Sequence, residues 1–161
     1  MVVDVIAILQ QYGNSTVEKI RQNLQSTGTN ATGKTSRSLR FEVTTDINTT
    51  TLKIIGRPFF NVVETGRKDT PYFTKPSKEF VASIQEWAKA KGVPGAAYAI
   101  AKSIHQNGTK LFQSGGRTDV YSNVVNQSLV DQISKDILNK FSEEYLKNAV
   151  KIFSSGASVN K

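Results

Sequence analysis

The chain has 161 residues and no cysteine, and its 21 Lys and Arg outnumber its 13 Asp and Glu, giving a net charge of +8 at pH 7. This length is enough for one domain with a buried core, and the lack of cysteine excludes disulfides, thiolate metal sites and cysteine nucleophiles. There is no run of about 18 apolar residues, so we expect no membrane-spanning segment and no membrane partner. The N-terminal segment carries Asp4 and only a short apolar stretch, so it predicts no secretory signal. The simplest location is the cytoplasm or a particle assembled there.

The first predicted element is an amphipathic helix in two parts. Apolar residues recur at helical spacing over residues 2–12 and again over residues 17–24. Gly13 interrupts the pattern, and Ser15 with Glu18 fits a capping box at the start of a helix. The sequence therefore predicts either one kinked N-terminal helix or two helices.

After this helix the apolar spacing changes from helical to alternating. Residues 36–45, SRSLRFEVTT, alternate apolar and polar side chains and predict a half-buried strand. Residues 50–57 predict a second strand, joined to the first by a turn at Asp46, and residues 59–64 predict a third. These strands would form a small antiparallel sheet.

Two helices are predicted in the centre of the chain. Ser77 is placed to cap the first, which extends to about Lys91, and the second covers about residues 97–107. The first helix carries apolar residues at i, i+4, i+7 and i+8, which predicts one buried stripe. This stripe consists of Phe80, Ile84, Trp87 and Ala88.

The last predicted element is a long C-terminal helix. Residues 109–122 are expected to be irregular, the helix covers about residues 128–153, and residues 154–161 are expected to form a flexible tail. The apolar face of this helix consists of Val130, Ile133, Ile137, Phe141 and Tyr145. The sequence thus predicts an α+β fold in a single domain, residues 1–153, with an N-terminal helix, a small antiparallel sheet, two central helices and a long C-terminal helix.

The pattern of a phosphate-binding loop occurs at residues 28–35, where GTNATGKT matches G-x-x-x-x-G-K-[ST]. Such a loop follows a buried strand and opens a helix, so that backbone N–H groups and the helix dipole point at the phosphates. Here a helix is predicted before the loop and a strand after it. We therefore expect no nucleotide site and no other cofactor.

Other catalytic chemistry is equally sparse in the sequence. The only histidine, His105, is expected to be a solvated residue near a helix C-terminus, and no second histidine exists to share a metal. No nucleophile-elbow motif is present. We expect no catalytic residue and no metal site, so the sequence does not predict an enzyme.

The whole excess of positive charge lies in the middle of the chain. Residues 34–117 contain fourteen Lys and Arg against six Asp and Glu, whereas the two flanking segments are neutral. Such a basic region suggests a polyanion partner, most often nucleic acid, although a soluble basic protein without that partner is the alternative. The residues expected to face DNA or a protein partner are Arg37, Arg40, Lys53, Arg57, Arg67 and Lys68.

Four short motifs follow one another in this region. ATGKTSRSL, residues 31–39, has Thr-Gly followed by Ser-Leu; FNVVETG, residues 60–66, has an aromatic residue before two valines, Glu and Gly. FTKPS, residues 73–77, has Phe before a Pro–small pair, and EWAKAKG, residues 86–92, has Trp-Ala and a Lys-Gly stop. In this order they resemble the minor-tail or tail-completion proteins of tailed bacteriophages. The residues that match are Thr32, Gly33, Ser38, Leu39, Phe60, Glu64, Gly66, Phe73 and Pro76.

The resemblance implies a structural virion protein of the head–tail neck. Such a subunit would form a homo-oligomeric ring around the DNA channel, next to portal or adaptor and tail proteins, after assembly in the host cytoplasm. Contacts with the packaged double-stranded DNA would be independent of base sequence. From the residues alone, Glu64 is expected to accept hydrogen bonds from loop N–H groups or to pair with an arginine.

A free basic nucleic-acid-binding protein is the alternative function. It is supported by the same excess charge and by aromatic residues near the basic ones: Phe59, Phe60, Tyr72 and Phe73. No helix-turn-helix or ribonucleoprotein sequence signature accompanies them.

Overall fold

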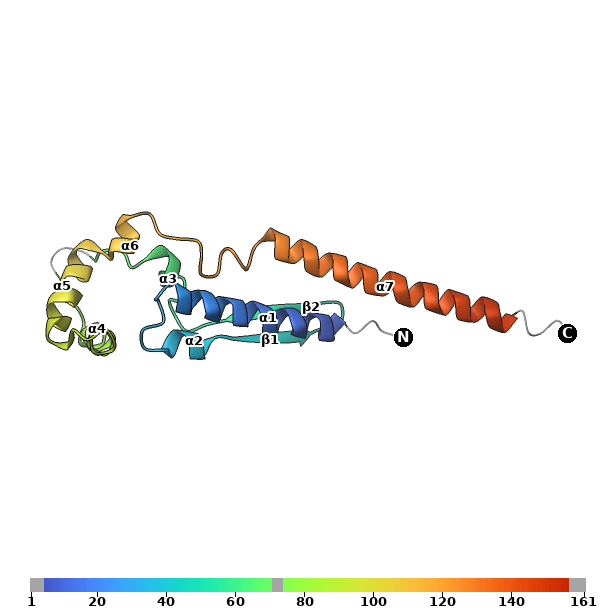
Figure 1. The fold of residues 1–161 in the computed structure, drawn as a ribbon, viewed down its shortest axis with the longest axis horizontal. Coiled ribbons are helices and arrows are strands. Elements are labelled where there is room, and N and C mark those ends of the chain that lie inside the picture. The colour runs from blue at the N-terminus through green and yellow to red at the C-terminus, as the bar shows by residue number, and fades with distance from the viewer. Residues whose placement is uncertain (1–4, 71–73, 157–161) are drawn as a thin grey trace.

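The computed structural model describes residues 5–70 and 74–156 and has the predicted α+β class. Helix α1 lies along a two-stranded sheet, α4 and α5 lie at one end of the molecule, and α7 extends past the other end (Figure 1). The elements in chain order are α1 (Val5–Ser26), α2 (Lys34–Ser38), β1 (Arg40–Thr45), β2 (Thr50–Ile55), α3 (Val62–Thr65), α4 (Lys78–Ala90), a 3-10 turn (Pro94–Ala96), α5 (Ala97–Asn107), α6 (Lys110–Gln113) and α7 (Gln127–Gly156).

Helix α1 supplies the centre of the hydrophobic core. Its apolar residues at i, i+3 and i+7, namely Val17, Ile20 and Leu24, are all buried, as the helical periodicity predicts. They pack against the sheet and against the segment between α6 and α7. The buried core cluster consists of Val17, Ile20, Leu24, Leu39, Val120 and Val124.

Of the two alternatives for the N-terminus, a single helix is the one found, because α1 is continuous through Gly13, and the predicted interruption there is absent from it. A Cβ atom at Gly13 would lie 2.4 Å from Cδ2 of Phe41, so the glycine permits close contact between helix and sheet. Ser15 does not cap a second helix; its hydroxyl donates to the Tyr12 carbonyl oxygen within α1. Glycine at position 13 therefore allows close packing of the helix on the sheet and does not end the helix.

Strands β1 and β2 form an antiparallel hairpin, as predicted, with Phe41 opposite Ile54. The turn at Asp46 is confirmed, since Asp46 and Thr49 exchange backbone hydrogen bonds. Phe41 and Ile54 pack against the core, and alternate residues of both strands face away from it. The sheet thus buries one face only.

The predicted third strand at residues 59–64 is wrong, because this segment forms a turn followed by α3. The N–H groups of Val62 and Val63 donate to the carbonyl oxygens of Phe59 and Phe60 at 3.0 and 3.1 Å. A short apolar run fits either a strand or a helical segment, and periodicity does not distinguish the two. Here Phe60 and Val63, three residues apart, both contact the core.

Helices α4 and α5 pack against each other at the end of the molecule away from α7. The Ser77 hydroxyl accepts a hydrogen bond from the Phe80 N–H, which confirms the predicted cap. Ala88 and Ala101 are fully buried, and their small side chains let the helices approach closely. The predicted buried stripe of α4 is wrong in part, because Trp87 remains 38% exposed.

The region predicted to be irregular, residues 109–122, contains the short helix α6 and then crosses α1. Val120 is fully buried in the core, and its carbonyl oxygen accepts a hydrogen bond from Asn23 Nδ2 at 2.8 Å. The chain then enters α7 at Gln127, one residue before the predicted start. This crossing segment leads into α7 and, with the hydrogen bond from the Tyr12 hydroxyl to Asp136, joins that helix to the rest of the fold.

Helix α7 continues to Gly156, so the flexible tail predicted from residue 154 does not begin there. The predicted tail residues 157–161 lie outside the described residues. No helix in the described part of the chain is both long and apolar enough to span a bilayer.

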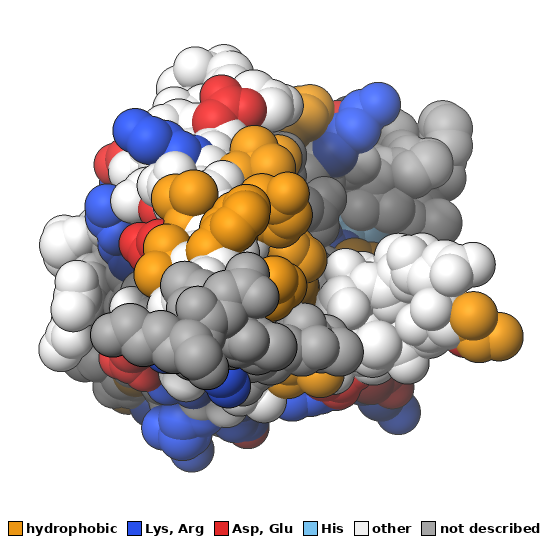
Figure 2. Space-filling view, turned by 90° about the vertical axis from the view of Figure 1, so that its right-hand side faces the viewer, with side chains coloured by type: hydrophobic (Ala, Val, Ile, Leu, Met, Phe, Trp, Pro, Cys, Tyr) orange, Lys and Arg blue, Asp and Glu red, His pale blue; other side chains and the backbone are white. Residues whose placement is uncertain are grey.

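The apolar face of α7 is covered only near its beginning. Ile133 and Ile137 are half-buried, and the Asp136 carboxylate accepts a hydrogen bond from the Tyr12 hydroxyl of α1. Tyr145, on the same predicted face, is 75% exposed. Viewed from the end of the molecule to which α7 extends, hydrophobic side chains gather in one patch (Figure 2).

Candidate functional site

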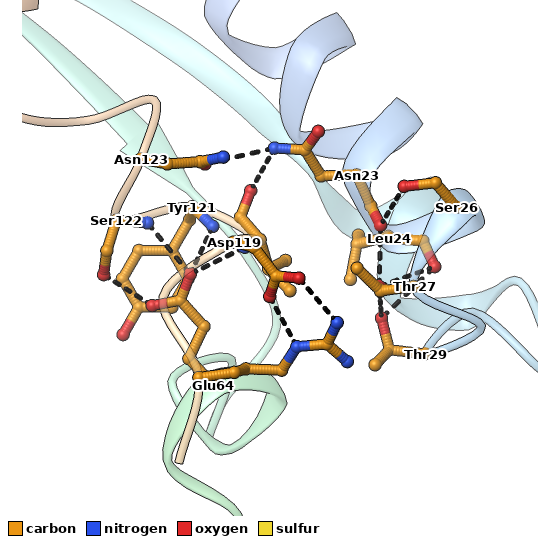
Figure 3. Close-up of polar contacts among 12 residues, drawn as sticks. Asn23, Leu24, Ser26, Thr27, Thr29, Glu64, Asp119, Tyr121, Ser122 and Asn123 are labelled. Carbon is orange, nitrogen blue, oxygen red and sulfur yellow. Dashed lines mark hydrogen bonds and ion pairs between the residues drawn. The ribbon is translucent and has the colours of Figure 1, made fainter.

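Glu64 of α3 holds a segment that lies 56 to 58 residues further along the chain (Figure 3). It is only 3% exposed. Its Oε1 accepts hydrogen bonds from the backbone N–H groups of Val120, Tyr121 and Ser122 at 2.9, 2.6 and 3.0 Å, and its Oε2 accepts one from the Ser122 hydroxyl. Of the two roles expected from the sequence, acceptance from loop N–H groups is the one found. We call this arrangement the Glu64 hub.

Two opposing effects set the charge state of Glu64. Burial by itself raises the pKa of this carboxyl group, since a poorly solvated site disfavours the charged form. The hydroxyl and N–H donors of Ser122, followed by the N–H groups of Tyr121 and Val120, favour the carboxylate and outweigh burial. The pKa of Glu64 is therefore lowered, and the hub is held by an anion.

Arg117 lies beside the Glu64 hub but does not pair with the Glu64 side chain. Its guanidinium donates to both Asp119 oxygens, from Nε at 2.5 Å and from Nη2 at 2.8 Å. Its backbone N–H donates to the Glu64 carbonyl oxygen at 2.8 Å. The segment is thus fixed to α3 through both backbone and side chain.

Two glycines allow the chain to pass close to α3. Gly66 has φ +70, and a Cβ atom there would lie 2.4 Å from the Phe112 backbone nitrogen. Gly116 has φ +85, and its Cβ atom would lie 2.8 Å from the Glu64 carbonyl oxygen. Both contacts are shorter than real Cβ atoms tolerate, so each site requires glycine for conformation and for space.

The structure brings two of the family-motif residues, Leu39 and Phe60, to one core. Leu39 is 2% exposed and belongs to the same hydrophobic cluster that Phe60 contacts, with the Phe60 ring 5.4 Å from the Tyr121 ring between centroids. The Ser38 hydroxyl donates to the Thr35 carbonyl oxygen and accepts from the Arg57 N–H. These contacts join α2, the end of β2 and α3.

The remaining motif residues lie further from this core. Thr32 is half-buried, and its carbonyl oxygen accepts a hydrogen bond from Arg37 Nη2 at 3.2 Å. Pro76 is half-buried just before α4. Phe73 lies outside the described residues.

The phosphate-loop pattern has an unexpected local structure. Gly33, with φ +70, precedes the five-residue helix α2, where the sequence predicts the chain to enter the first strand directly. The segment before the loop is helix α1, as predicted, and not the buried strand that a phosphate loop needs. The Lys34 ammonium pairs with Glu86 of α4. Lys34 thus joins α2 to α4 in this structure.

The six predicted basic residues fall into two groups. Arg37, Arg40 and Lys53 are exposed on α2 and the hairpin, where Arg40 pairs with Glu42 at 3.3 Å and Lys53 lies opposite Glu42 in the register. Acidic neighbours therefore weaken this group as a phosphate-binding surface. The second group, Arg57, Arg67 and Lys68, lines a groove.

This groove is lined by α3, α4, α5 and α6, and its volume is about 1380 Å³. Periodicity identified the shared face of α4 but gave no sign that this face remains partly uncovered. The aromatic and aliphatic side chains that line it, which define the apolar groove, include Phe59, Val62, Val63, Phe80, Ile84, Trp87 and Phe112.

Cations surround the apolar groove. The Arg67 guanidinium carbon lies 3.6 Å from the centroid of the Phe80 ring, and burial lowers the pKa of Arg67. Lys91 and Arg117, which were not among the six predicted basic residues, also line the groove. Glu64 is the only acidic residue among its described lining residues.

The prediction that His105 is solvated is wrong, because this residue is only 5% exposed. Its Nε2 lies 2.9 Å from the Thr74 hydroxyl, and its backbone carbonyl oxygen accepts a hydrogen bond from the Thr70 N–H. His105 therefore links α5 to the residues that lead into α4. In residues 5–70 and 74–156, no group of three or more His, Cys, Asp and Glu side chains is arranged to hold a metal ion.

Comparison of this chain with protein-family models, curated proteins and solved structures found no match.

Proposed function

We propose that the protein is a structural subunit of a tailed bacteriophage, part of the ring at the head–tail neck around the DNA channel. Its assembly takes place in the host cytoplasm, and its neighbours in the particle are portal or adaptor and tail proteins. Catalysis and cofactors have no part in this role.

The observation that carries the proposal is that three motif residues meet at the Glu64 hub and the core beside it. Leu39, Phe60 and Glu64 come from two separate motifs, yet they contact the same crossing segment or the same core. Gly66 is required by the close approach of that region to α6. Residues from separate motifs that contact one core are less easily explained as chance matches to short patterns. This supports the resemblance to neck proteins.

Charge and surface shape give further support. The basic middle of the chain suits a subunit close to packaged DNA or to an acidic neighbour. The exposed apolar face of α7 suits a protein that is covered by other subunits in the particle.

The first test is the assembly state of the purified full-length protein. We expect closed rings of one diameter by negative-stain electron microscopy, and a matching large species by analytical ultracentrifugation over a concentration series. Deletion of the gene from its phage is expected to yield filled heads without joined tails. A protein that is monomeric at every concentration contradicts the proposal.

A free nucleic-acid-binding protein is the second candidate, and Phe59 favours it. This side chain is 83% exposed beside Arg57, so a base could stack on its ring while the arginine contacts phosphate. The other aromatics give less support, because Phe60 packs in the core and residues 72 and 73 lie outside the described residues. Salt-dependent binding of short DNA by a monomer, lost in Phe59→Ala, would favour this candidate over the ring.

A further inference from the structure

The apolar groove carries positive charge that the described chain does not balance. Glu64, its one acid among the described lining residues, is already bound by four donors, and Arg117 pairs with Asp119. In residues 5–70 and 74–156, none of the other lining cations forms an ion pair with a carboxylate; these are Arg57, Arg67, Lys68 and Lys91. An anionic partner would balance this charge.

Arg67 is the cation best placed to bind such a partner. Its side chain is half-buried, and its guanidinium carbon lies 3.6 Å from the centroid of the Phe80 ring. Among the described residues, none accepts a hydrogen bond from this guanidinium. A planar guanidinium held on an aromatic ring can donate two parallel hydrogen bonds to one carboxylate. The groove therefore contains an ordered donor pair that lacks its acceptor.

The lining of the groove favours a polypeptide over a nucleic acid. Single-stranded nucleic acids bind by stacking bases on aromatic rings, and the aliphatic side chains of Val62, Val63 and Ile84 offer no such face. Arg67 already occupies one face of the Phe80 ring. A lining of this kind instead suits apolar side chains of a peptide, with carboxylates beside them for the cations.

The groove has the size of a short helix. Its volume of 1380 Å³ exceeds the range of about 300–1,000 Å³ that is usual for small-molecule pockets. A helix about 10 Å across rises 1.5 Å per residue, so each residue occupies about 120 Å³ and the groove holds about 12 residues. An amphipathic helix that lays its apolar face in a groove is a common mode of peptide recognition.

No described helix of this chain has the charge that the groove requires. Helix α1 has one acid against two basic residues, and α5 has one lysine and no acid. Helix α4 has two acids and two lysines, and α7 has four of each. None of these helices is acidic overall, so a second copy does not supply the partner. The occupant that fits comes from a different protein.

We propose that the apolar groove binds an acidic amphipathic helix of a different protein. Its apolar side chains pack against the lining of α3 and α4, and its carboxylates pair with Arg67, Lys68 and Lys91. This inference rests on the proposed function only for identifying that protein as a neighbour in the phage particle. The groove lies at the end of the molecule away from α7, so a partner there leaves α7 uncovered (Figure 1).

A designed peptide tests the groove in the full-length protein. The probe is a fluorescein-labelled, end-capped peptide of about 16 residues, long enough to form a helix, with Leu at i, i+3, i+4 and i+7 and Glu on the other face. The first control peptide has the same composition in shuffled order, and the second has Lys in place of Glu. By fluorescence anisotropy, the probe is expected to bind at least about tenfold more tightly than either control, because it alone combines stripe and charge.

Two variants place the binding site. Lys68→Glu with Lys91→Glu reverses two exposed groove cations and is expected to weaken probe binding at least about tenfold. Lys135→Glu with Lys147→Glu makes the same change in net charge on exposed positions of α7 and is the matched control, expected to bind as the wild type does. Unchanged urea midpoints verify that both variants are folded.

Three results overturn the inference. The first is a probe that binds no more tightly than the shuffled peptide, and the second is equal weakening in the groove and α7 variants. The third is an oligothymidylate that binds the groove more tightly than the probe and displaces it, which would make the occupant a nucleic acid.

The outcome for the neck ring is read separately by negative-stain electron microscopy. The groove variant is expected to form the same rings as the wild type, because a different protein occupies its groove. Loss of rings in this variant overturns the inference, since a second copy would then be the occupant. Probe binding by a wild-type protein that forms no ring contradicts the proposed function alone.

Discussion

Replacing Glu64 is the sharpest test of how this fold is held together. In Glu64→Ala, the N–H groups of Val120, Tyr121 and Ser122 and the Ser122 hydroxyl lose their shared acceptor. A buried donor without a partner costs about 1–3 kcal/mol, and a partly exposed one costs less because water reaches it. Only the bond to Val120 is fully buried, so we expect Glu64→Ala to lower the free energy of unfolding by about 3–5 kcal/mol.

Glu64→Gln is expected to cost less than Glu64→Ala. The amide oxygen can still accept from the three backbone N–H groups, and the amide nitrogen can donate to the Ser122 hydroxyl oxygen. What is lost is the added strength of hydrogen bonds to a charged acceptor, about 1 kcal/mol for each bond and less where water competes. We expect a total of about 1–3 kcal/mol.

Urea unfolding followed by circular dichroism measures these differences as a shift in the midpoint at constant slope. Glu18→Ala is the matched control, since Glu18 is an exposed helical carboxylate whose pair with Arg21 contributes about 1 kcal/mol at most. A Glu64→Ala variant no less stable than Glu18→Ala would refute the claim that the Glu64 hub stabilises the fold. So would a Gln variant that is less stable than the Ala variant.

Three further predictions follow from the same contacts. The pKa of Glu64 in the folded protein lies below its ordinary value of 4.5, so on acidification the unfolded chain binds this proton before the folded chain does. The stability that the hub adds is therefore expected to disappear as the pH falls below about 4.5 and through the folded pKa. Urea midpoints measured against pH should converge for wild type and Glu64→Gln in acid. Gly66→Ala is expected to cost more than 2 kcal/mol, roughly, because its Cβ atom would meet the Phe112 backbone, whereas Gly92→Ala shares a positive φ but has open space and should cost only about 1 kcal/mol. Lys34→Ala is expected to lower the melting temperature only slightly, because it removes an exposed ion pair with Glu86, and by the same amount with or without added nucleotide; a nucleotide-dependent rise that the variant abolishes would restore the phosphate-loop interpretation.

Periodicity predicted the elements whose burial follows from their own sequence. Val17, Ile20 and Leu24 are spaced for a helical face and are buried, and Phe41 alternates with polar neighbours and packs inward. The cap at Ser77 was predicted correctly because its hydroxyl bonds to the N–H of Phe80, only three residues further along the chain. Local signals of this kind need no knowledge of distant segments.

The errors share one cause, namely that the deciding partner is distant in sequence. In residues 5–70 and 74–156 the structure has no third strand to pair with residues 59–64, and this apolar run forms a turn followed by α3. Gly13 is a packing glycine only because Phe41 lies against it. The α4 periodicity showed which residues share a face, but not that Trp87 on this face would be left partly exposed. Glu64 was expected to accept loop N–H groups, but nothing local indicated that the loop would be residues 120–122.

The Glu64 hub also connects the apolar groove to the base of α7. Val62 and Val63 on α3 line the apolar groove, and Glu64 on the same short helix fixes the segment that leads, five residues after Ser122, into α7. The Glu64 carboxylate therefore helps to hold the groove and the base of α7 in one arrangement, together with the bonds from Arg117 to the Glu64 carbonyl oxygen and from Asn23 to the Val120 carbonyl oxygen. A ring such as the proposed one closes only if each subunit repeats the same rotation, so a rigid connection between α7 and the rest of the subunit favours closure over an irregular chain. For the proposed ring, we therefore expect Glu64→Gln, which retains the core, to broaden the distribution of ring sizes seen by negative-stain electron microscopy.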